Sequence, residues 1–113
     1  MSNKAVTEHF KLLEQIQNTY RDGDYAKCEK LCKKDIQLFP QYIIALAEEH
    51  GFNLDEEIPL RTVSFDTLAK LYEKQDRYSE AIKVCEMGIK HKLPDGTKGG
   101  FEGRLEKLKR KLR

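Results

Sequence analysis

Length and composition limit the kind of protein that this chain can form. Its 113 residues are 39% apolar and 35% charged, and 5 Tyr with 5 Phe are too many aromatic residues for a disordered chain. The formal charge of +2 does not by itself require a nucleic-acid or membrane partner.

A helical hairpin is predicted over about residues 3–40. Apolar residues recur every three or four positions in its first helix and so share one face. They are Val6, Phe10, Leu13, Ile16 and Tyr20. Asp22-Gly23-Asp24 interrupts this pattern, and Asp24 is suited to cap the next helix because its carboxylate accepts backbone N–H groups.

The second helix of this hairpin repeats the same spacing. Its apolar face contains Tyr25, Cys28, Leu31, Cys32, Ile36 and Phe39. We expect Pro40 to end the helix, because proline lacks the N–H group that a helix interior requires.

A connecting segment is predicted over residues 41–62. The apolar residues from Ile43 to Ala47 indicate a short helix that ends near Gly51, where glycine tolerates a left-handed C-cap. Residues 52–62 have no helical periodicity and include Pro59 and an acidic run at 55–57, so we expect a loop there.

A second hairpin is predicted over residues 63–93. Ser64 is suited to be the N-cap of its first helix, with Val63 and Leu68 as a hydrophobic staple. The turn Gln75-Asp76-Arg77 follows, and the second helix ends before Leu93-Pro94. The apolar faces contain Phe65, Leu68, Ala69 and Tyr72 in the first helix and Tyr78, Ala81, Ile82, Cys85 and Ile89 in the second.

A terminal amphipathic helix is predicted over residues 97–113. Its apolar face contains Phe101, Leu105, Leu108 and Leu112, and we expect this face to cap the second hairpin by packing antiparallel on its last helix. Gly100 and Gly103 lack side chains and are predicted to let the helix approach closely. No alternating strand pattern is present, so the predicted fold class is all-α, in one domain over residues 1–113.

The two hairpins resemble each other and a known repeat family. Sliding the chain along itself aligns Tyr25 with Tyr78 and Cys32 with Cys85. The second hairpin resembles a tetratricopeptide repeat in the order of its large and small core residues, and the first fits more loosely. The predicted repeat core is Phe65, Leu68, Ala69, Tyr72, Tyr78, Ala81, Cys85 and Gly88. Residues 95–104 are also similar to the end of small uncharacterised bacterial proteins built on such hairpins.

The resemblance implies a non-catalytic module that binds a protein or peptide on a concave surface or an uncovered apolar edge. The family's best-known mode grips a carboxylate with Lys, Arg and Asn, whereas Asp66, Thr67 and Lys70 occupy the corresponding face here, so we do not expect that mode. A homodimer is a further alternative.

The charge distribution leaves a second function open. Residues 98–113 are mainly basic, while residues 48–66 are mainly acidic. The candidate basic surface contains Arg104, Lys107, Lys109, Arg110, Lys111 and Arg113. It is either a solvated face with cations near a helix C-terminus, or a surface for nucleic acid or an acidic partner. Nucleic acid is favoured less, because exposed aromatic residues are not interleaved with these charges.

Catalytic, metal and cofactor sites are not predicted. Cys28 and Cys32 are spaced to hold two corners of a metal site, but they lie on an apolar face and no second ligand pair has matching spacing, so we interpret them as packing residues. His9, His50 and His91 are scattered along the sequence, so a Cys–His pair would depend on the fold.

The glycine-rich segment Gly96-Thr97-Lys98-Gly99-Gly100 has the residue types of a phosphate-binding loop. Their order is wrong for that motif, because Lys and the hydroxyl residue should follow the second glycine after a strand. We therefore favour a turn and helix cap over an anion site on the helix N-terminus.

No membrane span or secretion signal is recognised in this sequence. The longest apolar run, from Tyr42 to Ala47, is far shorter than the ~20 residues of a spanning helix. Residues 1–9 lack the continuous apolar segment of a signal peptide, and the 3 cysteines do not form a disulfide pattern. The expected location is the cytoplasm.

Overall fold

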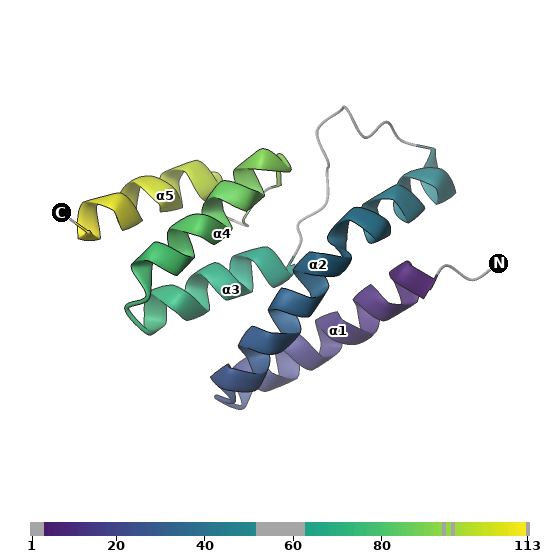
Figure 1. Ribbon diagram of the computed structural model, residues 1–113, viewed down its shortest axis with the longest axis horizontal. Coiled ribbons are helices and arrows are strands. Elements are labelled where there is room, and N and C mark those ends of the chain that lie inside the picture. Colours follow the sequence, from purple (N-terminus) through teal and green to yellow (C-terminus); the bar gives the residue numbers. More distant parts are fainter. Residues whose placement is uncertain (1–3, 52–62, 94, 96, 113) are drawn as a thin grey trace. The chain divides into compact units, whose positions relative to one another are not determined.

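The computed structural model describes residues 4–51, 63–93, 95 and 97–112, which form α-helices and no strand (Figure 1). This confirms the all-α fold class. The helices are α1 (Lys4–Arg21), α2 (Tyr25–His50), α3 (Val63–Lys74), α4 (Tyr78–Lys90) and α5 (Gly100–Lys111). The predicted acidic loop at 52–62 lies outside the described residues.

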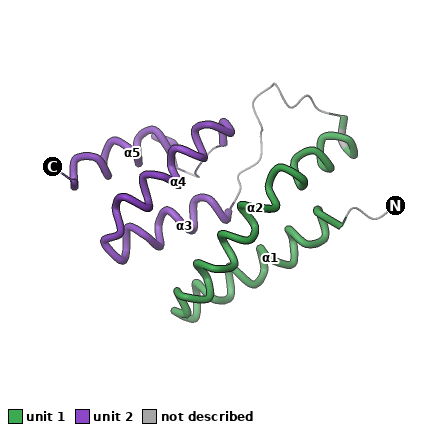
Figure 2. Tube along the Cα trace, in the orientation of Figure 1, with its two compact units in different colours: residues 1–57 green, residues 58–113 purple. Residues whose placement is uncertain are grey.

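Contacts within the chain group its residues into two compact units, 1–57 and 58–113, inside the span that we predicted as one domain (Figure 2). The first unit contains α1 and α2, which pack against each other. In the second unit α4 packs against both α3 and α5, so α5 covers the hairpin as predicted (Figure 1).

The turn between α1 and α2 has the predicted cap. The Asp24 carboxylate accepts a hydrogen bond from the backbone N–H of Lys27 at 3.4 Å, and Gly23 adopts a φ of 78° in the turn. The side chain thus satisfies one of the N–H groups that the first helical turn leaves without a partner.

The buried face of α1 differs from the predicted one. His9, Leu12 and Ile16 are buried, whereas Phe10 is 56% exposed and Leu13 is half-buried. Both Leu12 and Leu13 fit a helical period, so spacing alone does not choose between two overlapping faces. The facing helix makes the choice, because Asp35 of α2 bonds His9.

The prediction that Pro40 ends the second helix is wrong. The helix α2 continues through Pro40 to His50, so residues 41–50 form its last turns and not a separate helix. A proline inside a helix costs about 3 kcal/mol, which buried apolar side chains on both sides of it offset. These are Phe39, Tyr42, Ile43 and Leu46. Gly51 ends α2 with a left-handed φ of 72°, as predicted, and its N–H donates to the Ala47 carbonyl.

The start of α3 also differs from the prediction. The helix begins at Val63, so Ser64 lies inside it and is not the N-cap. Ser64 is fully buried, and its hydroxyl has no hydrogen-bond partner within the described part of the chain. Because a capping side chain requires a non-helical backbone, Ser64 cannot act as one here. Leu71 is buried as well, outside the predicted apolar face.

Gly88 has a different neighbour from the predicted one. As small members of the predicted repeat core, Gly88 and Ala81 are expected at the crossing with the helix of Phe65 and Tyr72. A Cβ atom placed at Gly88 would instead lie 2.5 Å from ring atoms of Phe101 in α5. A Cβ at Gly103 would meet no described atom within 4 Å, so Gly88, and not Gly103, permits the close approach of α5.

The apolar face of α5 is buried only in part. Phe101 and Leu108 are buried, Leu105 is half-buried and Leu112 is 54% exposed. The helix begins at Gly100, after the predicted start at residue 97, because the segment from Thr97 to Gly99 forms the preceding turn. Its packing therefore rests mainly on two side chains that lie two turns apart.

Candidate functional site

The basic residues of α5 divide into exposed and buried ones. Lys107, Lys109 and Arg110 are exposed, and Lys111 is exposed with its Nζ atom 5.2 Å from the centre of the Tyr78 ring. None of these four side chains forms an ion pair with the described residues. Arg113 lies outside the described residues. Four predicted members of the basic surface are thus exposed and available to a charged partner.

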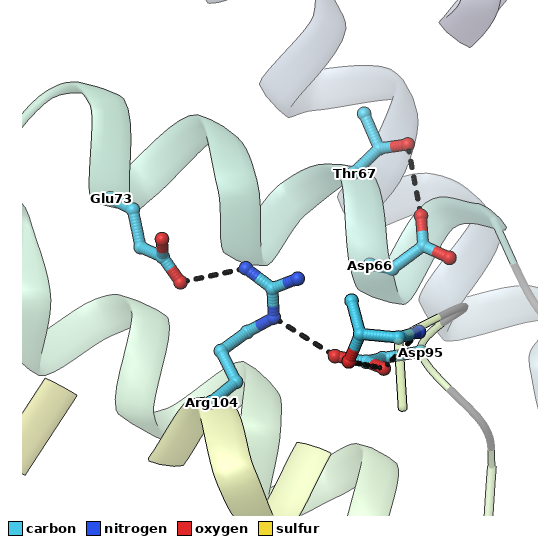
Figure 3. A network of polar contacts seen from close by, with 6 residues as sticks. Asp66, Thr67, Glu73, Asp95 and Arg104 are labelled. Carbon is cyan, nitrogen blue, oxygen red and sulfur yellow. Dashed lines mark hydrogen bonds and ion pairs between the residues drawn. The ribbon is translucent and has the colours of Figure 1, made fainter. Parts of the chain in front are cut away.

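Arg104 does not belong to that surface, contrary to the prediction. Its side chain is 13% exposed and lies between two carboxylates (Figure 3). Its Nε donates to Asp95 Oδ2 at 3.1 Å, and its Nη1 donates to Glu73 Oε1 at 2.8 Å. Arg104 therefore ties α5 to α3 and to the turn after α4.

Asp95 anchors this network from a fully buried position. Burial opposes its ionisation, but hydrogen bonds from the side chain and backbone of Thr97, together with Arg104, outweigh that effect and lower the pKa of Asp95. Burial likewise opposes the charge of Arg104, and Glu73 and Asp95 reverse this and raise the pKa of its guanidinium. Both groups of the pair are held in their charged forms.

Sequence reasoning missed this network, although one signal was available. Glu73 precedes Arg104 by 31 positions, so no local pattern joins them. Arg104 follows Phe101 by three positions and precedes Leu108 by four, which places it on the buried face of α5. A charged residue on an apolar face indicates a buried partner.

An open pocket of about 360 Å³ adjoins this network. It is bounded by the turn before α5, by one face of α5 and by α3. The lining residues are Glu73, Thr97, Lys98, Gly99, Gly100, Gly103, Arg104, Lys107, Leu108 and Lys111. The pocket thus brings three lysines together, of which the predicted basic surface contained only Lys107 and Lys111.

A second buried polar cluster lies in the first unit. His9 Nδ1 is 2.8 Å from Asp35 Oδ1, and the His9 ring stacks on Tyr42 with 3.9 Å between ring centres. Asp35 is 1% exposed, and its Oδ2 has no hydrogen-bond partner among the described residues. The sequence placed His9 and Asp35 at helical spacing from Leu12 and Cys32, so their position on the buried faces was predictable, but their pairing was not.

This His–Asp pair resembles part of a general acid–base arrangement. A carboxylate orients a histidine ring in many such sites, and a nucleophile must then lie within hydrogen-bond reach. His9 is only 6% exposed, and Asp35 is its only hydrogen-bond partner among the described residues. The arrangement is therefore suited to join α1 to α2 and lacks a contact with a described nucleophile.

The three cysteines are free thiols and fully buried. A hydrogen bond from Cys32, followed by one from Thr19, lowers the pKa of Cys28 to about 7 against the opposing effect of burial. Burial raises the pKa of Cys85 to about 12. No group of three His, Cys, Asp or Glu side chains within the described residues is arranged to hold a metal ion.

The predicted repeat-core residues are buried, except for Tyr78. Tyr78 is half-buried, and its hydroxyl donates to the Asp76 carboxylate at 2.8 Å. Asp66 is also fully buried and accepts a hydrogen bond from Thr67 at 3.5 Å, so it does not belong to an open ligand-gripping face (Figure 3).

Comparisons of the chain with protein families, with curated proteins and with solved structures found no match. Among the described helices, none combines the length and the apolar character that a membrane-spanning segment requires.

Proposed function

We propose that this protein is a non-catalytic cytoplasmic binding module, built on tetratricopeptide-like hairpins, that receives an acidic segment of a protein partner on its second unit. The observation that carries the proposal is the set of exposed basic side chains on α5, which have no ion-pair partner among the described residues. These are Lys107, Lys109, Arg110 and Lys111. Unpaired cations on one short helix attract an extended acidic segment and set its register.

A protein segment is favoured over nucleic acid by the chemistry of this surface. Binding of single strands usually adds base stacking on exposed aromatic rings to phosphate contacts. Phe101 is buried against α4, and the Tyr78 ring is engaged by Lys111. The surface therefore offers charge without a stacking platform among the described residues of α5.

A non-catalytic role is supported by the burial of the reactive groups. The thiols of Cys28, Cys32 and Cys85 are fully buried, and free buried thiols suit a reducing compartment. The His9 ring is enclosed by Asp35 and Tyr42. A substrate would have to displace core packing to reach any of these groups.

A fluorescence anisotropy titration tests this function with a labelled octapeptide of alternating Glu and Asp. We expect saturable binding that weakens at least tenfold in the variant carrying Lys107→Glu and Lys111→Glu. The matched control is Lys27→Glu with Lys30→Glu, which makes the same charge change on exposed residues of α2. A single-stranded oligonucleotide of equal charge serves as the competitor.

Two results would overturn the proposal. One is equal loss of peptide binding in the α5 and α2 variants, which would indicate only a response to net charge. The other is tighter binding of the oligonucleotide than of the peptide, with a logarithm of the association constant that falls linearly with the logarithm of the salt concentration. Counterion release from phosphate groups produces this dependence.

A further inference from the structure

We infer that the pocket beside α5 binds a phosphate group, either free or carried by a phosphorylated residue of the partner. The inference deepens the proposed function, because it names the chemical group that would occupy part of the same surface. The volume of the pocket, about 360 Å³, falls within the range of about 300–1,000 Å³ that is typical of small-ligand sites.

The pocket is electrostatically positive. Lys98, Lys107 and Lys111 line it, and none of them forms an ion pair with a described residue. The other charged lining residues, Glu73 and Arg104, bond each other at 2.8 Å. Arg104 also pairs with the buried Asp95, so its guanidinium offsets only one of the two carboxylates, and the three lysines still leave the lining with an excess of positive charge. Three lysines that line one concavity favour an anion with more than a single charge, and the Nζ atom of Lys111, which lies 5.2 Å from the centre of the Tyr78 ring, would turn from that ring towards the anion.

Phosphate suits these side chains better than a carboxylate does. The two-pronged guanidinium of arginine matches both carboxylate and phosphate, whereas lysine binds either group as a point charge, so at lysines the charge of the anion decides the strength of the attraction. The one arginine in the lining, Arg104, already donates its Nε and Nη1 to Asp95 and Glu73. A phosphate group carries a charge of about −1.5 to −2 near pH 7 and several acceptor oxygens, which three ammonium groups can share.

One carboxylate near the pocket opposes anion binding. Glu102 Oε2 lies 3.0 Å from the position of a Cβ atom built on Gly100, although Glu102 does not line the pocket. The inference therefore predicts that Glu102→Gln strengthens phosphate binding, by about two- to fivefold for the loss of one screened like charge.

Substitution of Gly103 can test whether an anion binds inside the pocket or is only attracted diffusely by the positive charge of α5. It lines the pocket, and a Cβ atom at this position would meet no described atom within 4 Å. A glutamine at position 103 can therefore be accommodated and can occupy part of the pocket without changing any charge. If Gly103→Gln loses phosphate binding, the phosphate must occupy the pocket itself, because this substitution leaves every charge unchanged.

The test is a titration with inorganic phosphate at pH 7.5 and constant ionic strength, followed by the backbone amide NMR signals of Gly99 and Gly100, which every variant retains. We expect saturable shifts with phosphate and none with acetate. Lys107→Gln with Lys111→Gln, and separately Gly103→Gln, should weaken the affinity at least tenfold. The control Lys109→Gln with Arg110→Gln removes two charges outside the pocket and should change it less than twofold.

A second arm distinguishes the sources of the phosphate group and separates this inference from the proposed function. A phosphoserine peptide that binds more tightly than both inorganic phosphate and its Ser→Glu counterpart would assign the pocket to a modified partner. Inorganic phosphate binding as tightly as the peptide would assign it to the free ion.

Non-saturable shifts, equal effects of the pocket and control variants, or equal shifts with acetate would overturn the inference, even if the acidic octapeptide still binds α5. Cooperative thermal unfolding of each variant, with a midpoint no lower than that of the parent protein, shows that the fold is retained.

Discussion

The ring of Phe101 in α5 occupies the space that a side chain at position 88 of α4 would need. A Cβ atom built on Gly88 would lie 2.5 Å from two ring carbons of Phe101, closer than packed carbon atoms come in proteins. Phe101 is fully buried, so the ring has little room to withdraw. This contact brings α5 close to the backbone of α4 in its last turn and makes residue 88 sensitive to the addition of a single methyl group.

Two glycine substitutions should therefore have opposite effects on stability. Alanine is usually preferred over glycine in a helix by up to about 1 kcal/mol. Gly103→Ala should raise the free energy of unfolding by up to this amount, because no described atom opposes the new methyl group. Gly88→Ala should lower it by about 1–3 kcal/mol, because the methyl group overlaps the Phe101 ring. Urea denaturation of the two variants beside the parent protein measures both changes.

The double variant Gly88→Ala with Phe101→Leu is the control for this prediction. Leucine lacks the ring, so the cost of Gly88→Ala should be smaller in this background than in the parent. Equal cost in both backgrounds would show that the ring does not cause the effect.

The leucines of α5 should differ in their contributions according to burial. Leu108 is 1% exposed, so Leu108→Ala should cost about 2–5 kcal/mol. Leu105 is half-buried, so Leu105→Ala should lower the free energy of unfolding by less than Leu108→Ala does. Leu112 is 54% exposed, so Leu112→Ala should change the free energy of unfolding by less than about 0.5 kcal/mol. Thermal unfolding of the three variants should give this order, and equal effects at 108 and 112 would contradict the packing of α5 on α4.

The buried Asp95 should make the free energy of unfolding of the second unit depend on pH in the acidic range. Its pKa is lower in the folded protein than in the unfolded chain, so its contribution is present above the usual carboxyl pKa of about 4. That contribution is lost as the pH falls towards the folded pKa. Asp95→Asn should therefore lower the free energy of unfolding by about 1–3 kcal/mol at pH 7 and by much less at pH 3.

Denaturation curves at the two pH values measure this dependence. Thr97→Val is a matched variant, because it removes the hydroxyl that bonds Asp95 but keeps the carboxylate and its pairing with Arg104. A loss for Asp95→Asn that is the same at pH 3 and pH 7 would contradict a lowered pKa.

The pairing of His9 with Asp35 should appear as strong coupling between two substitutions. His9→Phe leaves the buried Asp35 carboxylate without its hydrogen-bond donor and should cost about 3 kcal/mol. Adding Asp35→Leu removes the stranded carboxylate and should recover most of that loss, since apolar residues often replace a buried polar pair without cost. A double-mutant cycle measured by urea denaturation gives the coupling, and additive effects would show that the two side chains act independently.

Much of the helical organisation was predictable from local signals. Asp24 at the start of α2, Gly51 at its end and the turn at Gln75-Asp76-Arg77 each depend on the chemistry of a few adjacent residues. Their backbone requirements are expressed in the sequence itself, so the predicted positions were correct.

The errors arose where tertiary packing outweighed a local preference. Pro40 is a helix breaker in isolation, but apolar residues on both sides of it are buried, and α2 continues through it. Leu12 and Leu13 are equivalent in spacing, and only the facing helix determines which of them is buried. Local energies of this kind amount to a few kcal/mol, which burial of a few side chains can exceed.

The candidate site shows the same division. The sequence by itself determined an all-helical chain and a basic final helix, because periodicity and charge are properties of neighbouring residues. Only the tertiary structure decided that Arg104 pairs with Glu73 and Asp95, while Lys98, Lys107 and Lys111 line one pocket. Glu73 and Arg104 lie far apart along the chain, and the energy of a buried charge depends on which groups the fold brings within hydrogen-bond distance of it.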